Sequence, residues 1–331
     1  MKETVYIFSN GELKRKDNTL SFITNDGNKK YIPVEHIKEI FAFGEITLNA
    51  KALNFLSQKH IILHYFNYYG YYAGSFYARE HYNSGFMILK QANFYQDNNK
   101  RKTIAEKIIK GAAKNALKNL KYYHRRNENL QKYIDKIENF LPDLNKKNTI
   151  NQMMAVEGQI KQTYYASFNQ IISNDNFAFK DRNRRPPKDK LNALISFANA
   201  IIYTQTLSEI YQTHLDPRIG YLHSTNFRSF TLNLDIAEIF KPVIGDKVIF
   251  SIINKGIIKE KDFEKELNSV TLNDNGRKKF LKNLEKRLSY TIKHHTLKKK
   301  VSYRRLIRLE LYKLEKHLME EKNYQPFVMD W

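Results

Sequence analysis

The first eighty residues carry short apolar runs separated by turn-forming residues. Valine, isoleucine, threonine, tyrosine and phenylalanine dominate these runs, which cover residues 4–9, 19–24, 38–43 and 61–66. Such residues favour strands, and the Asn-Asp-Gly-Asn sequence at 25–28 favours a tight turn. The pattern predicts an antiparallel, β-sandwich-like domain over residues 1–80, with one helix at 49–58.

From about residue 86 the apolar positions recur every three and four residues, which is the period of helices that bury one face. The clearest segments cover residues 130–140, 152–171, 191–214, 234–254 and 277–294. Pro142 and the Pro186-Pro187 pair predict breaks, because proline disfavours helix at the residue before it. We therefore expect a linker at 81–85 and a larger all-α catalytic domain at 86–331, which makes the chain a two-domain α+β protein.

The charged residues are unevenly distributed along the chain. The 331 residues include 56 Lys and Arg against 34 Asp and Glu, a formal net charge of +22. Residues 1–80 hold 10 basic and 8 acidic residues, so nearly all of the surplus lies beyond them. It is densest at 100–126, with 10 basic residues and one acid, and at 277–316, with 15 and three. Each run alone could be a solvated helix face, but together they predict that the second domain binds nucleic acid.

Composition also excludes some classes of site. The chain contains no cysteine, so disulfides and thiolate metal sites are excluded, and a metal must be held by His, Asp, Glu or backbone oxygens. The first residues lack the apolar run of a signal peptide, and no segment approaches the roughly 20 apolar residues that span a bilayer. We expect a cytoplasmic protein with no membrane partner.

Two carboxylates lie three residues apart in the apolar segment LDIAEIF. If this segment is helical, Asp235 and Glu238 share one face, about 5–6 Å apart at Cβ. Their apolar neighbours predict that the face is partly buried, and buried unpaired carboxylates would cost several kcal/mol, which favours a bound cation. The spacing alone also fits a simpler structure, in which Asp235 caps the first turn and Glu238 pairs with Lys241.

Two other residues could complete such a site. His223 follows Gly220 in the loop sequence GYLHS, from which its side chain could reach the end of the following helix. Glu157 lies on a predicted helix among apolar residues. Taken singly, a histidine or a glutamate in these settings is more often structural, so the residues alone leave both readings open.

An arginine-rich loop precedes the long helix predicted at 191–214. Its sequence is RNRRPPKDKLN, and guanidinium groups on such a stiff loop suit the binding of phosphate through paired donors. The residues that we predict to contact DNA are Arg182, Arg184, Arg185, Lys188 and Arg228. The alternatives are scaffolding of the helix N-terminus or a dimer contact for the loop, and a salt bridge for Arg228.

These motifs together resemble the CRISPR-associated spacer-acquisition integrases, the family numbered one among the CRISPR-associated proteins, and most closely its type I-B branch. The family places a Glu-Gly pair on a helix, a histidine after a Gly-aromatic-Leu turn, and an Asp-x-x-Glu or Asp-x-x-Asp helix that ends in an aromatic residue, a basic residue and proline. This chain has them in the same order, as Glu157-Gly158, Gly220-Tyr221-Leu222-His223 and Asp235-Ile236-Ala237-Glu238 followed by Phe240-Lys241-Pro242.

The resemblance implies a catalytic site and its cofactor. Glu157, His223 and Glu238 would be ligands of Mn²⁺ or Mg²⁺, with Asp235 beside them as a supporting acid, and all four would be catalytic. Oxygen-rich ligation with one imidazole suits manganese.

The resemblance also implies an activity and an assembly. The protein would be a metal-dependent DNA endonuclease and integrase, which inserts short foreign DNA fragments into a CRISPR array by attack of a 3′-hydroxyl on a repeat phosphodiester. Its partners would be double-stranded DNA, a second copy in a homodimer, and the small companion protein of the family numbered two in a heterohexamer.

Two other functions fit the residues without the resemblance. A stand-alone repair nuclease would use the same ligands to cut branched DNA. A non-catalytic, basic nucleic-acid-binding protein would use the acidic and histidine motifs only as structural elements.

Overall fold

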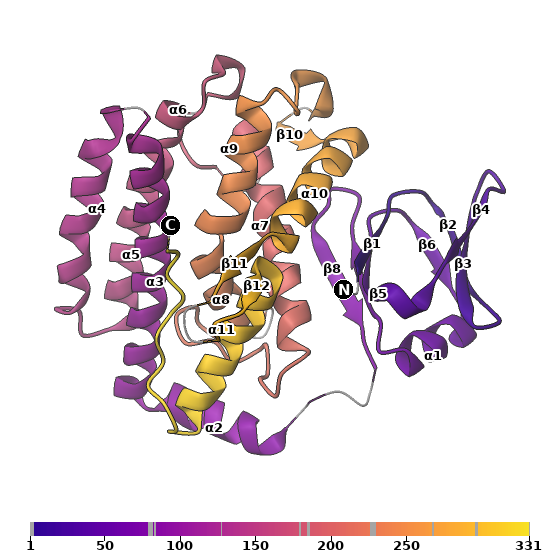
Figure 1. Ribbon diagram of the computed structural model, residues 1–331, viewed down its shortest axis with the longest axis horizontal. Helices are drawn as coiled ribbons and strands as arrows, with labels where there is room; N and C mark the ends of the chain where they lie inside the picture. The colour runs from indigo at the N-terminus through magenta and orange to yellow at the C-terminus, as the bar shows by residue number, and fades with distance from the viewer. Residues whose placement is uncertain are drawn as a thin grey trace. The chain divides into compact units, whose positions relative to one another are not determined.

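The computed structural model of the chain describes residues 3–78, 82, 84–126, 128–178, 180–183, 186–225, 230–266, 268–294 and 297–330. The chain divides into two compact units, Met1–Tyr82 and Asn83–Trp331 (Figure 1). The first unit is built mainly of strands and the second mainly of helices. This order confirms the α+β class predicted from the change of hydrophobic period.

The first unit contains two sheets and helix α1 (Ala50–Gln58) around a shared core. In one sheet the order is β1 (Glu3–Ile7), β5 (Ile37–Ala42), β7 (Ile62–Phe66) and β8 (Tyr72–Phe76). In the other it is β4 (Lys29–Ile32), β3 (Thr19–Thr24), β2 (Gly11–Lys16) and β6 (Ile46–Leu48). Apolar side chains from both sheets and from α1 meet in the core, since alternate residues of each strand face inward.

The antiparallel arrangement expected for this unit is wrong in part. Strand β5 pairs in parallel with both β1 and β7, and β2 pairs in parallel with β6. Parallel neighbours need a crossover connection. Between β5 and β7 the crossover includes β6 and α1, and between β1 and β5 it includes β2, β3 and β4. Alternation of apolar residues reports which face of a strand is buried, and it carries no information on strand direction.

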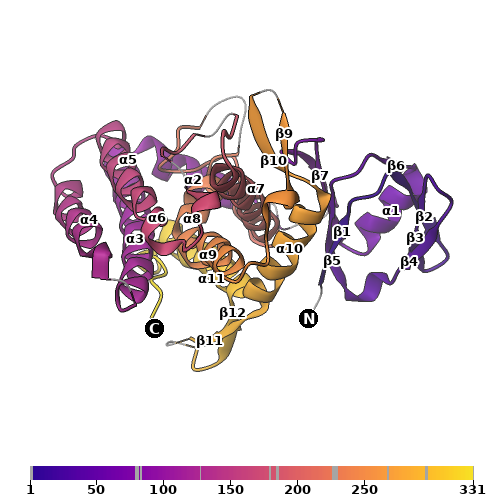
Figure 2. The ribbon, with the colours of Figure 1, turned by 90° about the horizontal axis from the view of Figure 1, so that it is seen from above.

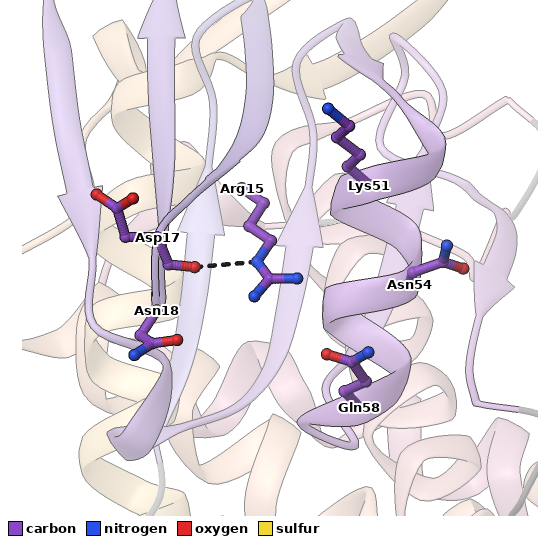
Figure 3. A pocket seen from close by; sticks show the side chains of 6 residues that line it. All are labelled: Arg15, Asp17, Asn18, Lys51, Asn54 and Gln58. Carbon is purple, nitrogen blue, oxygen red and sulfur yellow. Dashed lines mark hydrogen bonds between the residues drawn. The ribbon is translucent and has the colours of Figure 1, made fainter.

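A polar pocket of about 520 Å³ lies on the first unit beside α1 (Figure 3). Arg15 forms part of its wall, and its position is fixed by two contacts. Its Nε donates a hydrogen bond of 2.9 Å to the carbonyl of Asp17, and its guanidinium lies 4.7 Å from the centroid of the Phe55 ring. The side chains that line the pocket belong to Arg15, Asp17, Asn18, Lys51, Asn54 and Gln58.

The second unit packs long helices around a central short one (Figure 2). The α-helices described are α2 (Gly85–Gln96), α3 (Asn98–His124), α4 (Gln131–Leu144), α5 (Ile150–Ala166), α6 (Phe168–Ile171), α7 (Lys190–Ile210), α8 (Leu232–Phe240), α9 (Lys247–Asn254), α10 (Asp274–Ser289) and α11 (Tyr303–Leu318). Helix α8 packs against α3, α7 and α11. Because it is enclosed on several sides, its polar residues are withdrawn from solvent.

Three expectations for this unit need correction. The unit is not all helical, because it contains the hairpins β9 (Phe263–Glu266) with β10 (Ser269–Leu272) and β11 (Thr291–Lys293) with β12 (Lys300–Ser302). Pro142 does not end α4, which continues two residues further to Leu144, although proline cannot donate the hydrogen bond of its position. Pro242 divides the segment expected as one helix at 234–254.

The division at Pro242 takes the form of a wide turn. Residues Pro242–Asp246 are π-helical, and the amide of Asp246 donates to the carbonyl of Lys241 at 3.0 Å, five residues back. This π-helical turn connects α8 to α9. Within the described part of the chain, no helix is both long enough and apolar enough to cross a membrane.

Candidate active site

Helix α8 places Asp235 and Glu238 in the interior of the second unit. Their side chains are 0% and 4% exposed, respectively, although both are acids. The two residues are three apart on one helix, so both project towards the same region, as the spacing predicted. A carboxylate at this depth must find hydrogen bonds or a cation, because its burial is otherwise costly.

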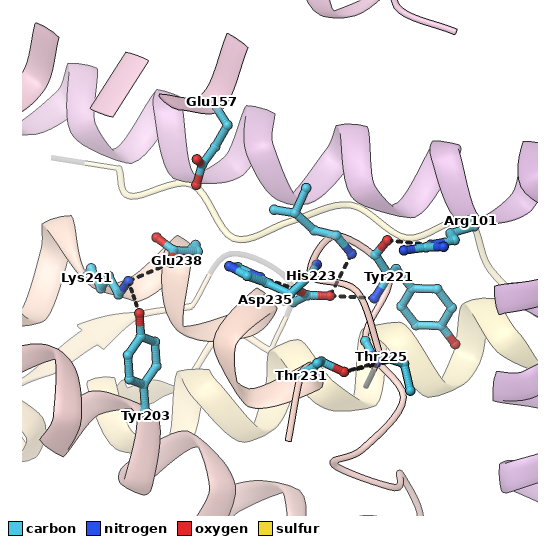
Figure 4. Close-up of polar contacts among 12 residues, drawn as sticks. Arg101, Glu157, Tyr203, Tyr221, His223, Thr225, Thr231, Asp235, Glu238 and Lys241 are labelled. Carbon is cyan, nitrogen blue, oxygen red and sulfur yellow. Dashed lines mark hydrogen bonds and ion pairs between the residues drawn. The ribbon is translucent and has the colours of Figure 1, made fainter. Parts of the chain in front are cut away.

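Asp235 finds its partners in the loop that precedes α8. One carboxylate oxygen, Oδ2, accepts hydrogen bonds from the amides of Tyr221 at 2.5 Å and Leu222 at 2.9 Å. The other, Oδ1, accepts from the amide of His223 at 2.9 Å and lies 2.7 Å from His223 Nδ1. The carboxylate therefore holds three successive backbone amides and one imidazole (Figure 4). Asp235 therefore holds the loop against α8. The alternative considered from the sequence was that it only caps the first turn of this helix.

Other contacts hold the same loop from its remaining sides. The Gly220 amide donates to Thr231 Oγ1 at 2.8 Å, and that hydroxyl donates to the carbonyl of Arg218 at 2.8 Å. From helix α3, Arg101 Nε donates to the carbonyl of Tyr221 at 2.9 Å. The ring of Tyr221 is fully buried. His223 thus projects from a loop whose backbone is fixed on several sides.

The bond to Asp235 determines what His223 can do. With Nδ1 directed at the carboxylate, Nε2 is the ring nitrogen that faces away from it and can act as a ligand. Burial lowers the pKa of His223, but the hydrogen bond and charge of Asp235, with a contribution from Glu238, outweigh burial and raise that pKa above its usual value.

Glu157 reaches the site from helix α5. This helix begins at Ile150 because Thr149 and Gln152 form a capping box, in which each side chain accepts from the other's backbone amide. Two turns later, Glu157 projects from α5 towards α8, where its carboxylate faces Glu238 (Figure 4). The structure thus brings Glu157, His223, Asp235 and Glu238, which lie on three separate segments, into one region.

Two lysines neutralise the carboxylates in this region. Lys161 Nζ forms ion pairs with both Glu157 and Glu238, and the latter contact is 2.9 Å. Lys241 Nζ donates to Glu238 Oε1 at 2.6 Å and to the Tyr203 hydroxyl at 2.5 Å. Burial raises the pKa of Glu238, but the charges of Lys161 and Lys241 outweigh burial and hold that pKa well below its usual range. Glu238 is therefore ionised.

The donor atoms suit a hard divalent cation, although they are not closed around one position. Glu157 and Glu238 offer carboxylate oxygens that converge on a single cation, the Lys161 ammonium, and His223 offers an imidazole next to Glu238 (Figure 4). Among the described residues, no three His, Asp or Glu side chains are already at metal-binding spacing. The Lys161 ammonium lies between the two carboxylates. The three side chains fit a divalent metal ion by the type of their donor atoms and by their charge.

Of the five residues predicted to contact DNA, the structure describes Arg182 and Lys188. Arg184, Arg185 and Arg228 lie outside the described residues. Arg182 Nη1 donates to Asn192 Oδ1 at 2.8 Å, and its Nη2 donates to Ser196 Oγ at 3.0 Å, both on helix α7. These bonds tie the Arg182 guanidinium to α7, as the scaffolding alternative requires.

Lys188 is exposed just before α7, where Asp189 caps the helix by accepting from the Asn192 amide at 2.8 Å. Contact of Lys188 or Arg182 with DNA stays a prediction.

Sequence reasoning missed several residues of the site. Lys161 had a usable signal, since it lies four residues after Glu157 on the same helix. Tyr203 and Arg101 had no such signal in the sequence, because each reaches the site from a distant helix.

Asp246 was also missed. Its burial in the π-helical turn, partly offset by a hydrogen bond from Tyr164, raises its pKa to about 7. The pairing of Glu238 with Lys241, weighed as an alternative, is present.

Two glycines of the family-like motifs differ in what surrounds them, and this difference predicts opposite effects of alanine. A Cβ at Gly220 would lie 2.7 Å from the Thr231 carbonyl carbon and 2.8 Å from Asp235 Oδ2, whereas a Cβ at Gly158 would meet nothing within 4 Å. We expect Gly220→Ala to lower the free energy of unfolding by about 1–3 kcal/mol. Gly158→Ala should raise it by about 0.5–1 kcal/mol, because alanine favours helix.

Urea unfolding of both variants measures these shifts. Equal shifts in the two proteins would mean that the close approach at Gly220 does not constrain the loop.

Comparison with known proteins agrees with this geometry. A family model described as "CRISPR associated protein Cas1" matches residues 5–286. A CRISPR-associated endonuclease Cas1 of Thermodesulfovibrio yellowstonii is 57% identical over 331 residues, which cover all of both chains. The solved structure of a CAS1 protein from Thermotoga maritima is 46% identical, covers 98% of this chain and 99% of its own, and superposes with a TM-score of 0.87.

A more distant structure shares the fold alone. It is a casposase bound to its integration product, with 19% identity, coverage of 99% of this chain and 93% of its own, and a TM-score of 0.87.

Proposed function

The chain belongs to the CRISPR-associated Cas1 family, and on that premise we propose that it inserts short foreign DNA fragments into a CRISPR array. In this reaction the 3′-hydroxyl of the fragment attacks a phosphodiester of the repeat. A new phosphorus–oxygen bond to the fragment forms, the bond to the repeat's own 3′-oxygen breaks, and that oxygen leaves as a hydroxyl after gaining a proton. Attack by water at the same phosphorus gives hydrolysis, which is the endonuclease activity.

Nuclease activity in this family is metal-dependent, and we assign the ion to Glu157, His223 and Glu238. A bound divalent cation would polarise the phosphorus and lower the pKa of the attacking hydroxyl. Mn²⁺ suits two carboxylates with one imidazole, and Mg²⁺ is the alternative. Asp235 is a positioning residue in this assignment, because it acts through the His223 ring.

The observation that carries this proposal is the convergence of one buried and one partly buried carboxylate and a fixed imidazole from three segments of the chain. Helix α5 supplies Glu157, helix α8 supplies Glu238, and the loop before α8 supplies His223, whose ring is oriented by Asp235. If Glu157 and Glu238 had only a structural role, their ion pairs with Lys161 and Lys241 would be sufficient. The additional fixing of a histidine beside that pair is what a ligand set requires.

The partners follow from the family and from charge. Double-stranded DNA, both the incoming fragment and the repeat, is the polyanion that the net charge of +22 would attract. The chain would act as a homodimer, and two such dimers would join the small companion Cas2 protein in a heterohexamer. We place this assembly in the cytoplasm, where the CRISPR array lies.

A joining assay with purified protein tests the proposal. A labelled DNA fragment, a plasmid that carries the repeat and Mn²⁺ are incubated with and without the companion protein. We expect the fragment to become covalently joined at the repeat when the companion is present. Cutting of branched DNA with no need for the repeat or the companion would instead support a repair nuclease. DNA binding that is unaffected by metal removal, with no joining or cutting in any of the mixtures, would support a non-catalytic binding protein.

A further inference from the structure

We propose that the Lys161 ammonium holds the place of the metal ion between Glu157 and Glu238, and that an incoming divalent cation must displace it. This inference rests on the proposed function, since it concerns the same carboxylates. It adds a residue that opposes metal binding and stabilises the metal-free site.

The contacts of Lys161 place its charge where a shared cation would lie. The two carboxylates come from different helices, α5 and α8, and they face each other across the site (Figure 4). Lys161 is one turn further along α5 than Glu157, and its Nζ contacts both carboxylates, with Glu238 Oε2 at 2.9 Å. A single point charge that joins two ionised oxygens from separate helices does the work that a metal ion would do between them.

Lys161 differs from Lys241 in its freedom to leave. The Lys241 side chain is 8% exposed, and its ammonium is held by Glu238, by the Tyr203 hydroxyl at 2.5 Å and by the Tyr203 ring at 4.5 Å. The Lys161 side chain is 22% exposed. Its flexible stem has a route to solvent, whereas Lys241 is anchored by an aromatic residue as well as by charge. Of these two cations, Lys161 is the one that can be exchanged.

The balance of charge explains why exchange is needed. Glu157 and Glu238 carry two negative charges, and the two ammonium groups neutralise them. If a divalent ion entered while both lysines stayed, these four side chains and the ion would together carry two excess positive charges, and like charges at short distance repel strongly. Departure of Lys161 removes half of this excess and frees one oxygen on each carboxylate for the ion.

The first experiment compares Mn²⁺ binding by calorimetry in the parent protein and in Lys161→Met, whose side chain keeps a similar length without charge. We expect the dissociation constant for Mn²⁺ to fall at least about tenfold in Lys161→Met, because the ion no longer competes with an ammonium. Lys110→Met is the matched control. Lys110 pairs with Glu106 at the same four-residue spacing on α3, so its loss should leave Mn²⁺ binding unchanged.

The second experiment uses the parent chain and does not depend on the folding of a variant. An amine-acetylating reagent is applied with and without Mn²⁺, and modification of individual lysines is followed by mass spectrometry. We expect Mn²⁺ to accelerate acetylation of Lys161 severalfold, because the displaced ammonium loses both ion pairs. Lys121, which pairs with Glu138 on the surface, serves as the internal reference and should not change.

The outcomes separate this inference from the proposed function. If the parent protein binds Mn²⁺ and the Glu238→Gln variant does not, the proposed metal site is supported. The displacement of Lys161 alone would be overturned by either of two results. One is Mn²⁺ binding by Lys161→Met that is no tighter than binding by the parent. The other is a rate of Lys161 acetylation that does not change when Mn²⁺ is added. If the parent binds no Mn²⁺ through Glu238, both the metal site and the inference are wrong.

Discussion

Glu238→Gln should lower the rate of strand transfer by about a thousandfold while the protein still binds duplex DNA. The substitution keeps the shape of the side chain and removes its charge, so the proposed ion loses one of its two carboxylates. The stabilisation that a metal gives to the transition state amounts to several kcal/mol, and about 4 kcal/mol corresponds to a thousandfold in rate. Timed joining assays at saturating Mn²⁺ measure this loss, and an electrophoretic shift assay measures DNA binding.

A control for stability is needed because Glu238 is also paired with Lys161 and Lys241. Glu209→Gln supplies it, since Glu209 is 1% exposed on α7 and pairs with Arg308 at 2.5 Å. Both variants should lose stability, because each leaves a cation without its acid. Only Glu238→Gln should lose strand transfer at a temperature where both proteins are folded. Equal activity of the two variants would show that Glu238 has a structural role alone.

Asp235→Asn should raise the Mn²⁺ concentration needed for half-maximal activity by about 10- to 100-fold, which is the usual effect of losing a group that orients a metal ligand. Each oxygen of Asp235 serves two donors. In whichever orientation the asparagine adopts, its NH₂ group faces at least one backbone amide that it cannot accept from. The loop at Tyr221 and Leu222 or the ring of His223 must therefore move.

The matched control for this second variant is Asp216→Asn. Asp216 is buried nearby in the same loop, and it accepts bonds from Arg218 at 2.6–2.9 Å. Among the described residues its side-chain hydrogen bonds join it to Arg218 and not to His223, so its loss should reduce stability without changing the Mn²⁺ requirement. If the two variants need the same Mn²⁺ concentration as the parent protein, Asp235 stabilises the loop and does not orient a ligand.

The sequence predicted local features of the fold better than their arrangement. The strand expected at residues 19–24 matches β3 to the residue, because alternating apolar residues and a following turn define it locally. Strand β2 was overlooked, since Lys14, Arg15 and Lys16 conceal its pattern. The parallel pairing of β5 with its neighbours depends on how crossovers pack, which no local pattern encodes.

The candidate site shows the same division between local pattern and tertiary contact. Resemblance to a family identified Glu157, His223 and Glu238, and the structure brings them into one region. Neither spacing nor composition could indicate that one ammonium joins two of them, because Lys161 meets Glu238 only when α5 and α8 pack together. The fixing of His223 by Asp235 likewise depends on a loop folding back twelve residues along the chain.

The most direct measurement is the position of Mn²⁺ in crystals soaked with the ion, located by its anomalous scattering. The proposed site predicts one peak within coordination distance of Glu157, His223 Nε2 and Glu238, with the Lys161 ammonium moved away from both carboxylates. A peak at other residues, or fully soaked crystals in which Lys161 still joins Glu157 to Glu238, would contradict it.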